Sequence, residues 1–149
     1  MEEKSIIIAL DVGTGKIGVA MSDPLRIGAN PVAVIARDGN EFEEIKKIVE
    51  SHNADTIIVG FPKTLRGEVG RQAEKVLEFT NTLRTYLNNK EIILWDERFT
   101  SVIAHRMFKA LGIRSKRERL IKDAAEAILI LQSYLNYIRR KRKSGNSGG

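Results

Sequence analysis

Three acidic residues occupy positions from which they could act together. Asp11 follows the apolar run at 6–10, Glu97 follows the apolar run at 91–95, and Asp123 lies within a late helical pattern. Ligands of open α/β sheets bind beyond the carboxyl ends of strands, so Asp11 and Glu97 meet at one edge if their strands are parallel near neighbours. At about 100° per residue, Asp123 falls at the rim of an apolar helical stripe, from which it could face that edge.

The chemistry that suits these acids is the binding of a hard divalent cation. Carboxylate oxygens are preferred by Mg²⁺, for which Mn²⁺ could substitute. Such a site beside a basic surface suggests metal-assisted cleavage of a phosphodiester. Each acid also has a plainer interpretation: Asp11 as a turn former, Glu97 as part of a solvated loop and Asp123 as a surface acid.

Composition excludes several other kinds of site. The chain has 149 residues, 42% of them hydrophobic and 30% charged, which fits one globular domain. It contains no Cys, which excludes disulfides, Cys-ligated zinc, iron–sulfur clusters and thiol catalysis. Its two histidines, His52 and His105, are expected to be ordinary helix residues. The longest apolar run, at 6–10, is too short to span a membrane, and the acidic N-terminus is unlike a secretory signal, so we expect a cytoplasmic protein with no membrane partner.

The net charge of +6 is concentrated in the C-terminal segment. Residues 1–113 hold 15 Lys and Arg against 16 Asp and Glu, whereas residues 114–149 hold 10 against 3. The basic residues of that segment form two clusters, at 114–119 and 139–143. Clustered cations release counterions from a phosphate backbone, which favours a nucleic-acid partner. A solvated tail that aids solubility is the alternative.

The hydrophobic pattern predicts an α/β fold with a mixed five-stranded sheet flanked by helices, in the order β-β-β-α-β-α-β-α-α. The expected strands lie at 5–10, 16–21, 31–36, 56–60 and 91–95. Helices are expected after the N-cap Asn40 and at about 68–88, 100–111 and 116–142. We expect one domain over 1–138 and a basic, disordered tail over 139–149.

Four blocks of the sequence together resemble one known family. They are Asp11 to Asp23, Gly60-Phe-Pro62 with Gly67, Gly70 and Ala73, Trp95 to Ser101, and Lys122 to Leu135. In this order and spacing they resemble the YqgF family, also known as RuvX or Holliday junction resolvase-like proteins. The resemblance extends over residues 6–138.

The resemblance implies a ribonuclease H-like fold and a nuclease that acts on structured nucleic acid. Maturation of the small-subunit (16S) rRNA precursor is the favoured role, and resolution of Holliday junctions in DNA is the alternative. The family's catalytic and metal-binding acids fall on Asp11, Glu97 and Asp123, the acids already singled out. The sequence departs from the family at Lys16, where Arg is common, and at Glu126, where a small residue is common.

Five further residues are candidates for contacts to nucleic acid. Lys16 and Arg98 could hold phosphates, although Arg98 could equally pair with an acidic neighbour. Lys63 and Arg66 lie in a basic loop that could close over the substrate or remain solvated. Thr100 could contact nucleic acid, and either Thr100 or Ser101 could cap the next helix. A monomer or a homodimer is compatible with these expectations.

Two readings from other classes remain open at this point. The acids could be structural in a non-catalytic protein that binds branched DNA or ribosomal RNA. The stretch from Asp11 to Gly15 also resembles the first phosphate loop of actin-like and sugar-kinase ATP-binding proteins. Their paired domains need a longer chain than 149 residues.

Overall fold

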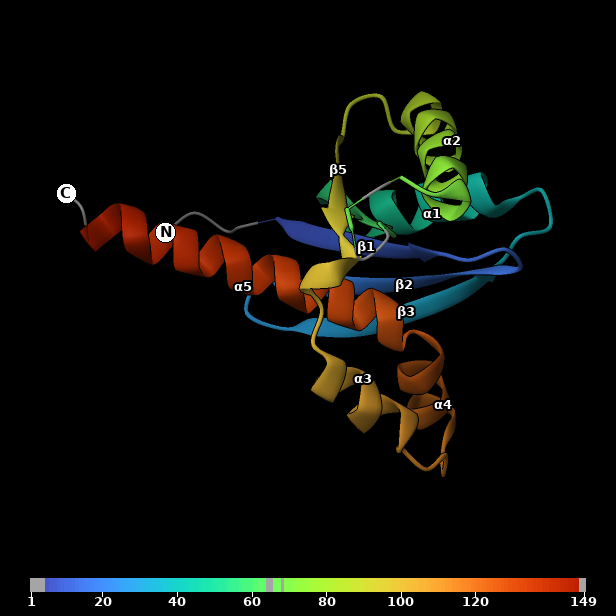
Figure 1. The fold of residues 1–149 in the computed structure, drawn as a ribbon. Coiled ribbons are helices and arrows are strands. Elements are labelled where there is room, and N and C mark those ends of the chain that lie inside the picture. Colours follow the sequence, from blue (N-terminus) through green and yellow to red (C-terminus); the bar gives the residue numbers. More distant parts are fainter. Residues whose placement is uncertain (1–4, 64–65, 68, 148–149) are drawn as a thin grey trace.

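A mixed five-stranded sheet forms the centre of the molecule (Figure 1). The computed structural model describes residues 5–63, 66–67 and 69–147. The strands are β1 (Ile6–Val12), β2 (Lys16–Ser22), β3 (Ala29–Ala36), β4 (Ala54–Phe61) and β5 (Glu91–Asp96). They lie in the order β3-β2-β1-β4-β5, with β2 antiparallel to both β1 and β3, and with β1, β4 and β5 parallel. The predicted mixed sheet and the α/β class are confirmed.

Helices cover both faces of the sheet. Helices α1 (Glu41–Ser51) and α2 (Arg71–Tyr86) lie on one face, and the long helix α5 (Ala125–Ser147) crosses the other (Figure 1). Between β5 and α5 the chain forms a 3-10 turn, η1 (Glu97–Phe99), and two short helices, α3 (Val102–Lys109) and α4 (Lys116–Asp123). These short helices project beyond the sheet below α5 (Figure 1).

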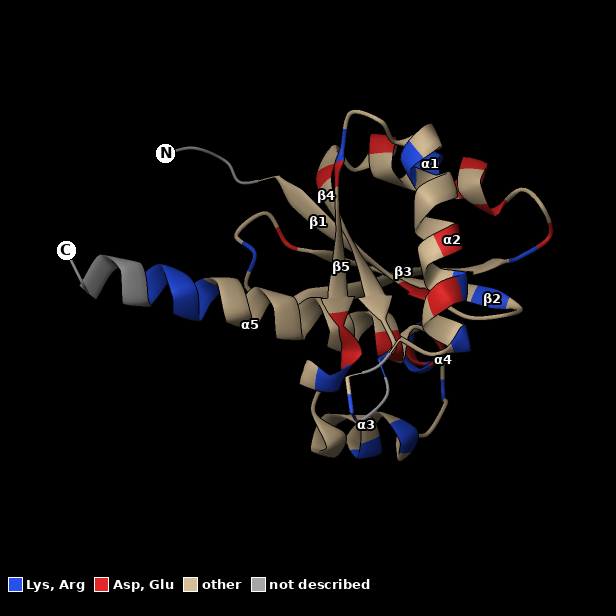
Figure 2. Ribbon diagram, turned by 45° about the horizontal axis from the view of Figure 1, so that its top comes forward, with Lys and Arg blue, Asp and Glu red and all other residues tan. Residues whose placement is uncertain are grey.

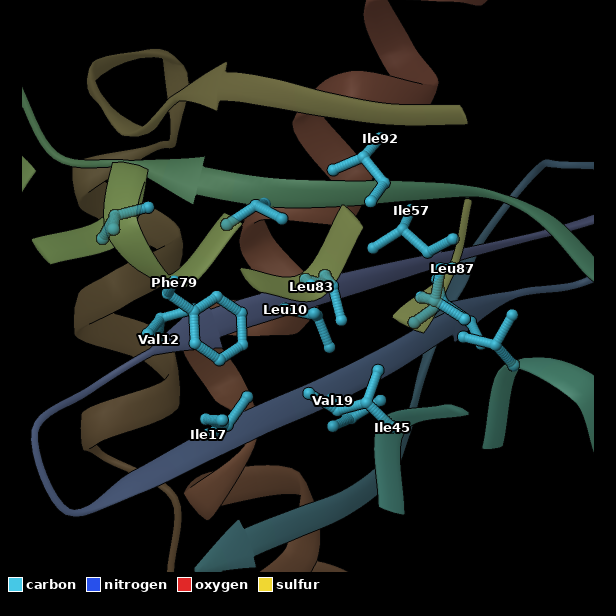
Figure 3. Close-up of a cluster of buried hydrophobic side chains, with 14 of the residues drawn as sticks. Leu10, Val12, Ile17, Val19, Ile45, Ile57, Phe79, Leu83, Leu87 and Ile92 are labelled. Atoms are coloured by element: carbon cyan, nitrogen blue, oxygen red, sulfur yellow. The ribbon is translucent and has the colours of Figure 1, made fainter. Parts of the chain in front are cut away.

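Alternation along the strands divides the core into two clusters. Successive strand residues point to opposite faces, so Leu10 and Ile57 lie on the α1/α2 face while their neighbours face α5. The first cluster is filled with branched and aromatic side chains from the sheet and from α1 and α2, including Val19 and Phe79 (Figure 3). On the other face, Ile7, Ala9, Ala20 and Ile58 pack against Ala127, Ile128, Ile130, Leu131 and Leu135 of α5.

The C-terminal helices differ from the prediction in two ways. The single helix expected at 116–142 is wrong, because the chain leaves helical geometry at Ala124, which caps α4, and starts again as α5. The break lets α5 lie along the sheet, where Ala124 and Ala125 are buried at its start. Helix α5 then continues through the basic run to Ser147, where a disordered tail was expected. Arg and Lys are good helix formers, so an anchored helix can propagate through them.

Local signals place other helix boundaries correctly. Ser115 caps α4 by accepting a hydrogen bond from the Glu118 backbone N–H at 3.1 Å, one residue before the predicted start of that helix at 116. Ser101 caps α3 in the same way, through the Ala104 N–H at 3.2 Å. Among the described residues, no helix combines the length and apolar character needed to cross a membrane.

Candidate active site

Asp11 and Glu97 lie on the same face of the sheet, at the carboxyl ends of two parallel strands. Strand β4 separates their strands, and its Gly60 pairs with Trp95 of β5. Asp11 stands two residues after Ala9 and so follows the strand alternation that faces α5. Glu97 opens η1, and its carboxylate lies on the same side, because a Cβ on Gly60 would meet both Glu97 and Ile130 of α5. The parallel arrangement that the prediction required is therefore present.

Gly60 keeps the space between these two acids open. A Cβ atom on Gly60 would lie 2.6 Å from Glu97 Oε1 and would also meet the Ile130 side chain. Asp11 has a similar neighbour in Gly18, its partner on β2, whose Cβ would lie 3.8 Å from Asp11 Cβ and 3.7 Å from Ala124 Cα. Residues without side chains thus line the floor of the site, and the start of α5 lies over it.

Burial and neighbouring negative charges raise the pKa values of both carboxyls. Burial, with the nearby charge of Glu126, raises the pKa of Asp11 to about 6, and the Lys16 ammonium partly opposes this rise. Burial also raises the pKa of Glu97 to about 7, with further contributions from the charges of Asp11, Glu126 and Asp96. Raised carboxyl pKa values in a cluster are typical of functional sites.

Glu126, rather than Asp123, is the acid from the C-terminal helices that raises both pKa values. It lies in the first turn of α5, and its side chain is half exposed. Asp123 is the last residue of α4, on the other side of the break at Ala124, and is exposed. In the sequence Glu126 stands out only as a departure from the family, although its position three residues after Asp123 is a usable signal.

His105 connects Glu126 to the segment that carries Glu97. Its Nδ1 lies 2.9 Å from Glu126 Oε1 and its Nε2 lies 2.9 Å from Thr100 Oγ1. Thr100 in turn donates from Oγ1 to the Glu97 carbonyl oxygen at 2.8 Å. The prediction that His105 is an ordinary helix residue is therefore wrong: it joins α3, α5 and η1 beside the acids.

Arg98 is held by its acidic neighbour Asp96. The guanidinium donates from Nε to Asp96 Oδ2 at 3.0 Å and from Nη2 to the same oxygen at 2.6 Å, and the Arg98 backbone N–H donates to Oδ1 at 2.9 Å. These hydrogen bonds lower the pKa of Asp96. Of the two roles open from the sequence, the structure contains the pairing with an acid. Gly67, in the loop that follows β4, lies against this guanidinium.

Comparison with known proteins identifies the family. The family model described as "RuvX: Holliday junction resolvase" matches residues 5–137. This chain belongs to the RuvX family. A relative from Clostridium botulinum (strain Hall), named "Putative pre-16S rRNA nuclease", is 45% identical over 133 residues, covering 87% of this chain and 96% of its own. A relative of the same name from Clostridium tetani is 44% identical over 138 residues, covering 91% and 99%.

Solved structures show how the RuvX chain is folded. It is similar to Thermus thermophilus RuvC in complex with a Holliday junction, with a TM-score of 0.62 at 11% identity over 92% of this chain and 96% of that one. It is also similar to the fowlpox virus Holliday junction resolvase, with a TM-score of 0.54 at 15% identity, covering 89% and 99%. The ribonuclease H-like fold implied by the sequence is confirmed.

The basic residues predicted to contact nucleic acid differ in how closely the structure associates them with the acids. Lys16 begins β2 and is exposed, and its charge acts on Asp11. The Lys63 ammonium lies 6.0 Å from the centroid of the Phe61 ring, and its charge acts on Asp96. Arg66 is exposed in the loop, of which residues 64, 65 and 68 lie outside the described part. Figure 2 shows more basic residues on α3, on α4 and along the outer half of α5.

Proposed function

We propose that this RuvX-family protein is a divalent-metal-dependent nuclease that cleaves phosphodiester bonds of structured nucleic acid, with the 16S rRNA precursor as its substrate. The placement of Asp11 and Glu97 on either side of Gly60 carries the proposal. The clostridial relatives, at 44–45% identity and nearly full coverage, support the substrate by their names. This role would place the protein in the cytoplasm.

The residues at the site fit a hard cation such as Mg²⁺, with Mn²⁺ as a substitute. The donors are carboxylate oxygens, and a Cβ on Gly60 would fill the space beside Glu97. No group of three or more His, Asp or Glu side chains stands at metal-binding spacing within the described residues, so the carboxylates would have to draw together around the ion. We assign Asp11, Glu97 and Asp123 as its holders, with Glu126 as a further candidate. When bound, the cation would supply an acidified water and neutralise charge on the phosphate.

The other side chains have positioning roles in this proposal. Lys16, beside Asp11, would attract the phosphate on which the reaction occurs. Asp96 and Arg98 would fix the turn that carries Glu97, because their hydrogen bonds close η1. His105 and Thr100 would hold Glu126 near the same turn. Lys63 and Arg66 would meet the substrate from the neighbouring loop.

A cleavage assay tests this function. Wild type with 16S rRNA precursor should cut in Mg²⁺ or Mn²⁺ and should be inactive in EDTA. Asp11→Asn should lower cleavage by roughly a hundredfold or more while leaving the fold and most RNA binding intact. Asp38→Asn, which changes an exposed acid in the β3–α1 loop, is the matched control and should cut normally. Normal cleavage by a folded Asp11→Asn protein would overturn the metal site.

The same assay separates Asp123 from Glu126. Asp123→Asn and Glu126→Gln remove one charge each from the two sides of the break at Ala124. Replacement of the acid that completes the site should lower the cleavage rate as severely as Asp11→Asn does. Equal and normal activity in both variants would restrict the site to Asp11 and Glu97.

Resolution of Holliday junctions is the second candidate, favoured by the description of the matching family model. A four-way DNA junction should then be cut symmetrically in the same buffer. Paired cuts would require two copies of the chain related by twofold symmetry. Cleavage of the junction in preference to precursor RNA would replace the first candidate with this one.

A further inference from the structure

An aromatic groove lies beside the acids, between β5, η1, α3 and α5. It encloses about 490 Å³, within the range of roughly 300–1,000 Å³ typical of ligand pockets. Trp95, Phe99 and Tyr137 form its aromatic wall, and Asn136 and Arg140 add polar groups. None of these side chains has a role in the nuclease site described above.

The aromatic wall offers exposed ring surface in a fixed arrangement. Trp95 Nε1 donates to Ser133 Oγ at 2.7 Å, which anchors the indole on α5. Around it, the ring centroids of Phe99 and Tyr137 lie at 5.3 Å and 5.2 Å. Phe99 and Tyr137 nevertheless remain 62% and 41% exposed. Large aromatic side chains left this exposed beside a pocket are suited to stacking with a flat ligand.

The charge around the groove indicates an anionic ligand. Arg140 lines the groove and belongs to the basic run at 139–143. A second hollow of about 340 Å³, lined by Asn136, Arg139, Arg140 and Lys143, continues from it along α5. Flat rings attached to a chain of phosphates match an aromatic slot that opens into a basic channel.

Two residues of the groove also lie close to Glu97 along the chain. Trp95 and Phe99 flank Glu97 in sequence, two residues before it and two after it. Trp95 pairs with Gly60, beside which the Glu97 carboxylate lies. A nucleotide seated in the groove would therefore have its backbone next to the site where cleavage is proposed.

We propose that this groove binds one unpaired nucleobase of the substrate, stacked among Trp95, Phe99 and Tyr137, with the adjoining phosphate on Arg140. The inference rests on the proposed nuclease function. It adds that the protein recognises its substrate at a base that is not paired within a nucleic-acid double helix. Asn136 would contribute amide donors to the edge of the base, because its oxygen already accepts from Gln132 Nε2 at 3.1 Å.

Trp95 is the only tryptophan of the chain, so its fluorescence reports on this groove directly. Wild type is titrated in EDTA with a short oligoribonucleotide, with the matching oligodeoxyribonucleotide, and with an abasic strand of equal length. Strands that carry bases should quench the emission and saturate it. The abasic strand should bind through its phosphates, as followed by anisotropy, without quenching. Equal quenching by the abasic strand would overturn the proposal.

Alanine variants locate the base. Phe99→Ala and Tyr137→Ala should each weaken binding of base-containing strands by roughly tenfold and leave abasic binding unchanged. Two controls accompany them. Leu25→Ala, at an exposed residue outside the groove, should change neither affinity, and Arg142→Gln should weaken both strands alike. Unchanged affinity in both aromatic variants would overturn the proposal, as would a dimer that Tyr137→Ala dissociates, because a second copy would then fill the groove.

These binding measurements need no divalent cation, so their outcome does not depend on whether the protein cleaves nucleic acid. If the protein does not bind bases but still cuts in Mg²⁺, only the proposal for the groove is overturned. Saturable, base-dependent quenching in a wild type that cuts neither RNA nor DNA would support the groove and overturn the nuclease.

Discussion

The two faces of the sheet make opposite use of their residues. Under α1 and α2, the strands present large side chains such as Leu10, Ile57 and Val59, all fully buried. Under the start of α5, the strands present Ala20, Gly18 and Gly60, and the acids stand among them. The first face gains stability from packing, whereas the second gives up side-chain volume to leave space.

This contrast means that stability and chemistry are carried by different faces. Burial of Asp11 and Glu97 opposes their ionisation and so costs folding energy near neutral pH. The packed face must offset that cost. Substitutions on the packed face should therefore change stability without changing the chemistry, and those on the open face should change both or trade one for the other.

The largest expected effect comes from a cavity on the packed face. Ile57 is fully buried there, so Ile57→Ala should lower the free energy of unfolding by about 3 kcal/mol. Urea denaturation measures this loss, and cleavage per folded molecule should be unchanged. Leu25→Ala, at a side chain that is 68% exposed, should stay within about 0.5 kcal/mol of wild type. A similar loss in both variants would contradict the division between faces.

The next effect comes from filling the open face. Gly60→Ala places a methyl against Glu97 and Ile130, so it should cost roughly 2 kcal/mol of stability through overpacking. It should also lower cleavage at least tenfold, because Glu97 must move away. Gly28→Ala, where the added Cβ meets no atom within 4 Å, is the matched control. Full activity in Gly60→Ala would show that the gap between the acids is dispensable.

The sequence predicts the packed face and its elements well. Apolar residues repeat at strand and helix spacing there, and Asp11 and Glu97 follow from their positions at strand ends. The break at Ala124 could not be predicted, because no Gly or Pro lies between residues 113 and 144 to mark it. It arises where α5 docks on small residues of the sheet, which is a tertiary contact. For the same reason the link from His105 to Glu126, across 21 residues, had no local signal.

A smaller effect is expected in the pH dependence of stability, which Asp11 on the open face should influence. The pKa of Asp11 is raised from its ordinary value of 3.8 to about 6 in the folded protein, so the folded state holds the proton more tightly than the unfolded chain. Stability from this group is full below pH 3.8 and is lost as pH rises through 6. Solvent contact reduces the effect, and Asp11→Asn should raise the unfolding free energy at pH 8 by between roughly 1 and 2 kcal/mol.

Thermal unfolding in EDTA at pH 8 and at pH 4 measures this difference. The gain from Asp11→Asn should shrink at the lower pH, where wild type carries a protonated Asp11. Asp38→Asn, which changes an exposed acid outside the site, is the matched control, and its unfolding free energy should stay within about 0.5 kcal/mol of wild type. A gain that grows as pH falls would have the wrong sign and would place Asp11 in a site that favours its charge.

The smallest expected effect comes from comparing the two histidines, because His52 lies on the packed face and His105 lies beside the acids. His52 caps α1 on the packed face, with Nδ1 lying 2.9 Å from the Ile48 carbonyl oxygen, whereas His105 holds Glu126. His105→Ala should slow cleavage roughly fivefold, corresponding to about 1 kcal/mol for the lost hydrogen bond to Glu126, with substrate affinity unchanged. His105→Gln should recover part of the rate, since its amide can still donate to Glu126. His52→Ala should leave the rate at the wild-type value, and an equal slowing in both variants would show that His105 acts only through stability.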